Sequence, residues 1–376
     1  AQVFSYAFIP EARDYWAGRG GQDAFQNQLV VTGAGLLILG ATSVLVTTTL
    51  YSLRRKAHKA RQLGSYIIDR KMGKGGMGEV FVARHARMCR PSAVKVLRVS
   101  GALDLDALAR FELEVQLSSS LTHPNTITIF DFGRAGQNTF YYAMEYLEGL
   151  DLQRMVQRFG PLGAERTIFL LTQVCGSLAE AHGRHIVHRD MKPANIFLTQ
   201  RGGLFDYVKV LDFGLAKHVD SGDGKGVTKA GLILGTPEYM APEAIRDEGR
   251  VDTRADLYGL GAVAYYLLTG QPPFQGKTQL QTLVDQVRKP PVPPSAVTEI
   301  EVPVELESIV LRCLEKWPAE RYQTAEELEA DLRAVPLEET WNLDRAREWW
   351  MLHSGVIRPV LYESAPGRGA PAASSG

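Results

Sequence analysis

A glycine-rich run at residues 73–80 is the first stretch whose residue types could do chemistry. The run reads GKGGMGEV and places Gly73, Gly75 and Gly78 between two segments that are rich in β-forming residues. Glycine carries no Cβ, so such a loop lets the backbone approach phosphate oxygens closely. A dinucleotide-binding loop would open a helix, whereas Glu79 begins an expected strand. From this run alone, an ordinary glycine-rich hairpin and a nucleotide-binding loop both stay open.

Lys95 and Glu114 form a second candidate pair. Lys95 ends the sequence Ala93-Val94-Lys95 in an expected strand, and Glu114 lies on the helix expected next. A lysine that binds phosphates needs a carboxylate to fix its flexible side chain, so we expect an ion pair between Lys95 and Glu114. Glu112 is a competing partner on the same helix. Taken alone, either member of the pair could be a solvated surface charge.

Three further motifs follow in order. Residues 188–195 read HRDMKPAN, residues 212–214 read DFG, and residues 241–243 read APE. Together with the glycine run, the lysine and the helix glutamate, this ordered set resembles the eukaryotic-like protein kinase superfamily, specifically the membrane-anchored bacterial serine/threonine kinases. The resemblance covers about residues 66–334.

This resemblance implies a site for ATP and Mg²⁺, with Mn²⁺ as an alternative metal. Phosphoryl transfer passes through a highly charged transition state, so positioning and charge neutralisation dominate its catalysis. Asp190 would accept the hydroxyl proton of the substrate, and Lys192 would neutralise the moving phosphoryl group. Asp212 and Asn195 would hold metal ions through oxygen ligands. The implied ATP-binding residues are Gly73, Gly75, Gly78, Val80, Ala93, Lys95, Met144, Glu145, Leu147 and Asp151.

The adenine and ribose positions carry more specific expectations. The backbone of Glu145 and Leu147 would bind the adenine edge at a hinge between two lobes, and Asp151 would meet the ribose hydroxyls. Met144 would close the back of that pocket, which is compatible with its being an ordinary core residue.

Substrate class and regulation follow from the same resemblance. Lys192, two residues after Asp190, and the sequence Gly235-Thr236-Pro237 resemble serine/threonine kinases rather than tyrosine kinases. The implied partners are therefore protein substrates with serine or threonine hydroxyls. Thr228 is the expected activating phosphorylation site, because Arg189 could engage its phosphate and order the loop.

Structural contacts are implied as well. Asp256 resembles the family aspartate that accepts backbone amides of the catalytic loop, and His188 is expected to pack and hydrogen-bond rather than act as a base. Glu243 and Arg321 resemble a buried ion pair that ties the activation segment to the C-terminal lobe. Surface charges are the alternative for this pair.

The elements that must position these residues change in type along the chain. Strand-like segments come first and longer helical patterns dominate after residue 150, which predicts an α+β fold with a small β-rich lobe and a larger helical lobe. We expect strands at 66–71, 79–84, 92–97, 126–132 and 139–145, and helices at 103–119, 162–182, 253–268, 305–314 and 325–335.

An uncharged run lies between Asp23 and Arg54 near the start of the chain. A helix needs only about 20 apolar residues to cross a bilayer, so residues 29–53 are expected to form a transmembrane helix, with a buried soluble helix as the alternative. Basic residues follow the run and mark the cytoplasmic side, which would place the kinase domain in the cytoplasm. Gly33 and Gly40 share a helix face, which would allow a homodimer through this span; the span has no GxxxG pair, and a lipid-facing position of these glycines is the alternative.

Composition and the remaining segments complete the expected organisation. The 42 basic and 42 acidic residues balance, which gives no indication of a nucleic-acid partner. Three tryptophans in the tail, Trp341, Trp349 and Trp350, are expected to pack on the C-terminal lobe, with binding to a partner or a membrane surface as the alternative. The expected parts are an extracytoplasmic stub or loop at 1–28, the span at 29–53, a basic linker at 54–65, the kinase domain at 66–334 and a partly disordered tail at 335–376.

Two functions from different classes fit these observations. The first is an active, membrane-anchored serine/threonine kinase. The second is a pseudokinase scaffold that binds nucleotide and partners without turnover. Loss of Lys95, Asp190, Asn195 or Asp212 would favour the scaffold, and all four are present.

Overall fold

The computed structural model describes residues 22–60, 62–75, 78–98, 105–135, 139–213, 236–246 and 251–357. Contacts between Cα atoms divide the chain into two units, Ala1–Ile67 and Ile68–Gly376. The expected activating residue, Thr228, lies outside the described residues.

A single long helix, α3 (Gln22–Ala60), dominates the first unit. Its segment Val30–Thr49 has a mean hydropathy of 2.0 and no buried residues, so it is long and apolar enough to cross a membrane. Thr32 and Thr47 donate their hydroxyls to the helix carbonyls of Gln28 and Ser43, which satisfies these polar groups inside the helix.

The β-rich lobe is built on one sheet, in the order β1-β2-β3-β4-β6-β5. Its strands are β1 (Gln62–Leu63), β2 (Tyr66–Gly75), β3 (Gly78–His85), β4 (Pro91–Arg98), β5 (Ile129–Arg134) and β6 (Thr139–Glu145). Helix α4 (Leu105–Ser119) packs next to β5. The expected strand at 126–132 begins only at Ile129, because Thr126 forms an isolated bridge to Val210 instead.

Register decides which side chains of this lobe face the site. Ala93, Lys95 and Leu97 on β4 stand opposite Met144, Tyr142 and Phe140 on β6. Opposed residues of an antiparallel pair share one face of the sheet. Five of these six, all except Lys95, belong to one buried apolar cluster that also contains Val115 of α4. The lysine is therefore the charged member of an otherwise apolar or aromatic face.

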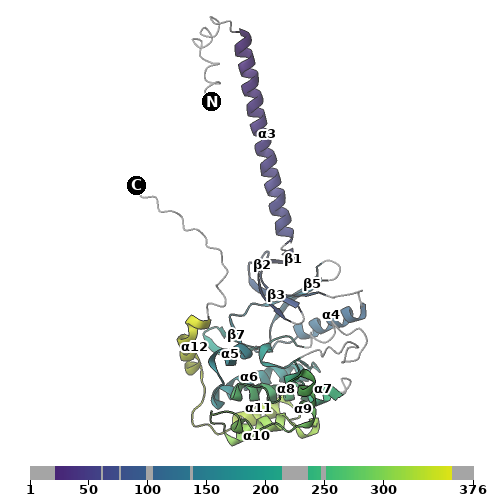
Figure 1. Ribbon diagram of the computed structural model, residues 1–376, viewed down its shortest axis with the longest axis vertical. Helices are drawn as coiled ribbons and strands as arrows, with labels where there is room; N and C mark the ends of the chain where they lie inside the picture. Colours follow the sequence, from purple (N-terminus) through teal and green to yellow (C-terminus); the bar gives the residue numbers. More distant parts are fainter. Residues whose placement is uncertain are drawn as a thin grey trace. The chain divides into compact units, whose positions relative to one another are not determined.

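The helical lobe forms around two buried helices, α6 (Ala164–Gly183) and α8 (Arg254–Thr269) (Figure 1). Helices α11 (Ala325–Ala334) and α10 (Val304–Cys313) cover α6 and α8 respectively. The other elements are α5 (Leu152–Phe159), α7 (Pro242–Arg246), α9 (Gln279–Arg288), and a small sheet of β7 (Gly149–Asp151), β8 (Ile196–Arg201) and β9 (Leu204–Val210). Strands first and helices afterwards confirm the predicted α+β architecture.

The tail folds back onto this lobe as helix α12 (Leu343–Ile357), which contacts β9. The indole N–H groups of Trp341 and Trp350 donate to the two oxygens of the buried Asp206, at 2.9 and 2.7 Å. Arg166 binds the same carboxylate through two hydrogen bonds, and its guanidinium lies 4.0 Å from the ring centroid of Trp349. The expected packing of the tail tryptophans on the C-terminal lobe is confirmed.

Candidate active site

Lys95 reaches across to Asp212, which follows β9. Its Nζ lies 2.6 Å from Oδ2 of Asp212. The expected ion pair between Lys95 and Glu114 stays a prediction, and the contact with Asp212 was not expected. Strand β4 directs the lysine toward the segment after β9, where the carboxylate of Asp212 lies within reach. The competitor Glu112 binds Arg134 on β5 instead, at 2.8 Å.

Tyr142 is a second partner of Asp212. Its hydroxyl donates to Oδ1 at 2.5 Å, from a side chain that is buried in the sheet. Burial alone would raise the pKa of Asp212, but the Lys95 ammonium and the Tyr142 hydroxyl outweigh it and hold that pKa below its usual value. Burial, and then the negative charge of Asp212, raise the pKa of Tyr142 well above 10.0, so the phenol stays a neutral donor.

The catalytic loop brings three predicted side chains together, those of Asp190, Lys192 and Asn195. Oδ2 of Asp190 lies 2.7 Å from Nζ of Lys192 and accepts a hydrogen bond from Nδ2 of Asn195 at 2.9 Å. Asn195 also donates to the carbonyl of Asp190, which fixes the two residues to each other. Nζ of Lys192 donates to Oγ1 of Thr236 at 3.3 Å. The loop therefore holds one carboxylate oxygen of Asp190 between a cation and an amide.

Asp256, at the start of α8, fixes the backbone of the catalytic loop. This buried aspartate accepts the backbone N–H of His188 at 2.7 Å and that of Arg189 at 2.8 Å, as predicted. The ring of His188 contacts the carbonyl of Leu211 at 2.8 Å, and the Leu211 N–H donates to the carbonyl of Asn195. His188 is thus a packing and hydrogen-bonding residue that links the loop to the segment carrying Asp212.

The hinge residues have contacts that the sequence did not reveal. Met144 is buried in the apolar cluster of the β-rich lobe, as expected of a core residue. The carboxylate of Glu145 binds Nζ of the buried Lys209 at 2.6 Å and a guanidinium nitrogen of Arg201 at 2.7 Å. A lysine between two valines near the end of β9 was the available sign of this pair. Burial raises the pKa of Asp151, which caps α5 by accepting the backbone N–H of Arg154.

The glycine loop is described at both ends, without residues 76 and 77. Gly73 lies in β2, and a Cβ there would meet nothing within 4 Å. Gly78 opens β3 with a φ of 158°, and a Cβ there would lie 2.3 Å from the carbonyl oxygen of Val96. Gly78 therefore serves the close approach of β3 to β4, whereas the space beside Gly73 is open.

The residues present suit a magnesium nucleotide. In the part of the chain that the structure describes, no group of three His, Cys, Asp or Glu side chains could hold a metal by itself. Mg²⁺ is usually held by one or two carboxylates together with the phosphates of its nucleotide. Asp212 and Asn195, joined through the backbone of Leu211, supply oxygen ligands of this kind.

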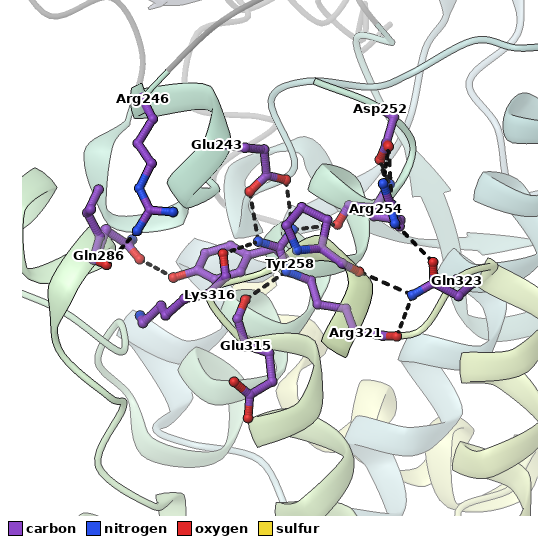
Figure 2. Close-up of polar contacts among 12 residues, drawn as sticks. Glu243, Arg246, Asp252, Arg254, Tyr258, Gln286, Glu315, Lys316, Arg321 and Gln323 are labelled. Atoms are coloured by element: carbon purple, nitrogen blue, oxygen red, sulfur yellow. Dashed lines mark hydrogen bonds and ion pairs between the residues drawn. The ribbon is translucent and has the colours of Figure 1, made fainter. Parts of the chain in front are cut away.

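A buried ion pair anchors the end of the activation segment (Figure 2). Two guanidinium nitrogens of Arg321 lie 2.7 Å from the two carboxylate oxygens of Glu243 in α7. Arg321 also donates to the backbone carbonyls of Glu315, Lys316 and Arg254. The predicted pairing is confirmed, and it joins α7 to the segment before α11.

Comparisons with known proteins agree with this geometry. The protein kinase domain family matches residues 66–332. The chain belongs to the protein kinase family. Among relatives, the serine/threonine-protein kinase pkn3 of Myxococcus xanthus is 39% identical over 302 residues, which cover 80% of this chain and 55% of that protein. PknB of Mycobacterium tuberculosis is 40% identical over 273 residues, which cover 72% of this chain and 42% of that protein.

Solved structures show the same kinase fold. The crystal structure of the Mycobacterium tuberculosis PknI kinase domain matches with a TM-score of 0.56 at 28% identity and covers 73% of this chain and 96% of that chain. Rad53 1–466 in complex with AMP-PNP matches with a TM-score of 0.58 at 28% identity, covering 70% of this chain and 64% of that chain. The kinase spans about half the length of the two relatives named above, or less.

Proposed function

We propose that this kinase transfers the γ-phosphate of ATP to serine and threonine hydroxyls of proteins. The observation that carries the proposal is the joined constellation of Lys95 with Asp212 and of Asp190 with Lys192 and Asn195. The backbone of Leu211 connects the two groups. The family uses ATP and Mg²⁺, and the two relatives named above are called serine/threonine-protein kinases.

Each residue has a role that its contacts support. Asp190 accepts the substrate hydroxyl proton, with its Oδ2 oriented by Lys192 and Asn195. Lys192, which also bonds Thr236, neutralises the transferred phosphoryl group. Lys95 binds the α- and β-phosphates once it leaves Asp212. Bound Mg²⁺ would supply positive charge to the β- and γ-phosphates, next to Asp212 and Asn195.

The test is phosphotransfer by the full 376-residue chain with labelled ATP, Mg²⁺ and a generic acceptor protein. We expect phosphoserine and phosphothreonine in the products. Asp190→Asn should lower turnover by about 10²–10⁴-fold, since positioned proton acceptance is worth that much. Asp344→Asn, at the exposed start of α12, is the matched control and should keep wild-type turnover. A well-folded Asp190→Asn protein with normal turnover would refute the assigned role, and a wild-type chain that binds ATP without turnover would favour a pseudokinase scaffold.

Regulation by autophosphorylation is part of the same proposal. Arg189, beside the catalytic aspartate, has an exposed side chain and a backbone N–H that is held by Asp256, so its cation is within reach of a loop phosphate. Mass spectrometry of the reaction above should find phosphate on Thr228. Full activity in Thr228→Ala would remove this threonine from the mechanism.

Membrane anchoring is also proposed, with residues 29–53 spanning the bilayer and the kinase domain in the cytoplasm. The support is the exposed apolar segment Val30–Thr49 of α3, followed by the basic residues Arg54, Arg55 and Lys56. Access to ATP agrees with this orientation.

A further inference from the structure

Tyr142 occupies a place in the active site that the mechanism above does not use. It lies on β6 directly opposite Lys95 of β4, so both side chains stand on the sheet face that looks toward Asp212. The tyrosine side chain is 1% exposed and belongs to the buried cluster with Leu97, Val115 and Met144. Its ring therefore joins the sheet to α4, while its hydroxyl points at the segment after β9.

The hydroxyl is not needed for packing. A phenylalanine would fill the same apolar surroundings, and a buried phenol without a partner would be unfavourable. In the described part of the chain, the hydroxyl donates to Oδ1 of Asp212 at 2.5 Å. Among the contacts that the structure describes, Asp212 is thus the hydrogen-bond partner of the Tyr142 hydroxyl.

The two oxygens of Asp212 are divided between two donors. Oδ1 accepts from Tyr142, and Oδ2 accepts from Nζ of Lys95, which lies 5.8 Å from the centre of the tyrosine ring. A carboxylate held at one oxygen keeps its plane when the cation at the other oxygen is exchanged. Hydrogen bonds of this kind to metal-binding carboxylates typically change metal affinity by about 10–100-fold.

We propose that Tyr142 is a positioning residue for Asp212: its hydroxyl fixes Oδ1, so that Oδ2 stays aimed when it passes from Lys95 to the metal of the bound nucleotide. The inference rests on the proposed use of a magnesium nucleotide. It makes Tyr142 a determinant of the metal dependence of nucleotide binding, distinct from the residues that contact the nucleotide.

The test separates metal-dependent from metal-independent nucleotide binding in the full chain. Isothermal titration with ADP is performed in excess EDTA and at increasing Mg²⁺ concentrations. In Tyr142→Phe, we expect the affinity in EDTA to stay within about twofold, while the Mg²⁺ concentration for half-maximal enhancement rises about tenfold. Tyr142→Met, which fills the same cluster without a hydroxyl, should show the same split.

Tyr141→Phe is the matched control. Tyr141 is a buried tyrosine one position earlier on β6, opposite Val96, and therefore on the other face of the sheet. It should bind nucleotide like the wild type at every Mg²⁺ concentration. In an Asp212→Asn background, Tyr142→Phe should have no further effect, because the two changes remove the same interaction.

The outcomes distinguish this inference from the proposed function. Wild-type protein that shows no Mg²⁺-dependent nucleotide binding would overturn both. A normal wild type with an unchanged Mg²⁺ response in Tyr142→Phe would overturn only the role of the hydroxyl. An equal loss of affinity with and without Mg²⁺ in both Tyr142 variants would also overturn it, since that result means general damage to the pocket.

Discussion

Lys316 places an ammonium group in an aromatic and cationic environment near the base of the activation segment (Figure 2). Its Nζ lies 4.1 Å from the ring centroid of Phe274 and 5.9 Å from that of Tyr258. The atom is buried without a hydrogen-bond partner among the described residues. Burial, and then repulsion from Arg321, lowers the pKa of Lys316 from 10.5 to about 8. The folded state therefore disfavours the proton on this lysine.

This lowered pKa makes the free energy of unfolding of the kinase vary with pH in the alkaline range. Between pH 8 and 10.5 the unfolded chain binds more protons at Lys316 than the folded one, so stability from this group rises with pH across that window. Lys316→Met should raise the melting temperature at pH 7, and its advantage over wild type should shrink as the pH approaches 10. Calorimetry checks both. Lys277→Met, at an exposed lysine, should change neither, and a variant less stable than wild type at pH 7 would contradict the assignment.

The order of the motifs predicted that Asp190, Lys192 and Asn195 would lie together, and their side chains are in contact in the structure. It could not predict that Lys95 binds Asp212, since this contact depends on which carboxylate folding brings within reach. Tyr142 was missed for the same reason: a strand tyrosine is ordinary until the register puts it opposite Lys95. The Asp256 contacts were predictable because their donors are backbone amides of the motif itself.

At the scale of elements, the folded body continues past the matched kinase domain. The family match ends at residue 332, yet Trp341, just before α12, and Trp350 of α12 both donate hydrogen bonds to Asp206 of β9. Phe159 of α5 contacts the ring of Trp349 edge-on, with 4.9 Å between ring centroids. The spacing of the tryptophans predicted this packing. It did not predict that Asp206 accepts their hydrogen bonds, because this residue of β9 lies far away in the sequence.

The tryptophan contacts with Asp206 should stabilise the helical lobe. Trp350→Phe removes the N–H that bonds Oδ1 of the buried carboxylate, and loss of a hydrogen bond to a buried charge costs about 1–3 kcal/mol. Thermal or urea unfolding measures the loss. Trp317→Phe is the control, because Trp317 is 59% exposed, and it should leave stability within about 0.5 kcal/mol of wild type. Equal stability of the two variants would show that the tail contacts are energetically neutral.

For the whole molecule, the expected topology can be tested with reporters. A reporter fused after Gly376 should be cytoplasmic and one fused before Ala1 should not be, because basic residues follow the apolar segment. Protease protection in membrane vesicles measures both. Replacing Arg54, Arg55 and Lys56 with glutamine should produce a mixed orientation, whereas glutamine at Arg13 and Arg19 should not. A soluble full-length protein would refute the span.

The unbroken course of α3 has a mechanical consequence. Its 39 residues make a rod of about 58 Å, of which the segment Val30–Thr49 accounts for about 30 Å. Residues 50–60 continue the same helix about 16 Å further. Each residue of an α-helix rotates the chain by about 100° about the helix axis. The number of residues after Thr49 therefore sets the direction, around that axis, in which the chain leaves the helix. Two residues inserted after Thr49 would therefore turn the end of the helix by about 200°, nearly to the opposite side, while seven would bring it back to within about 20° of its original direction.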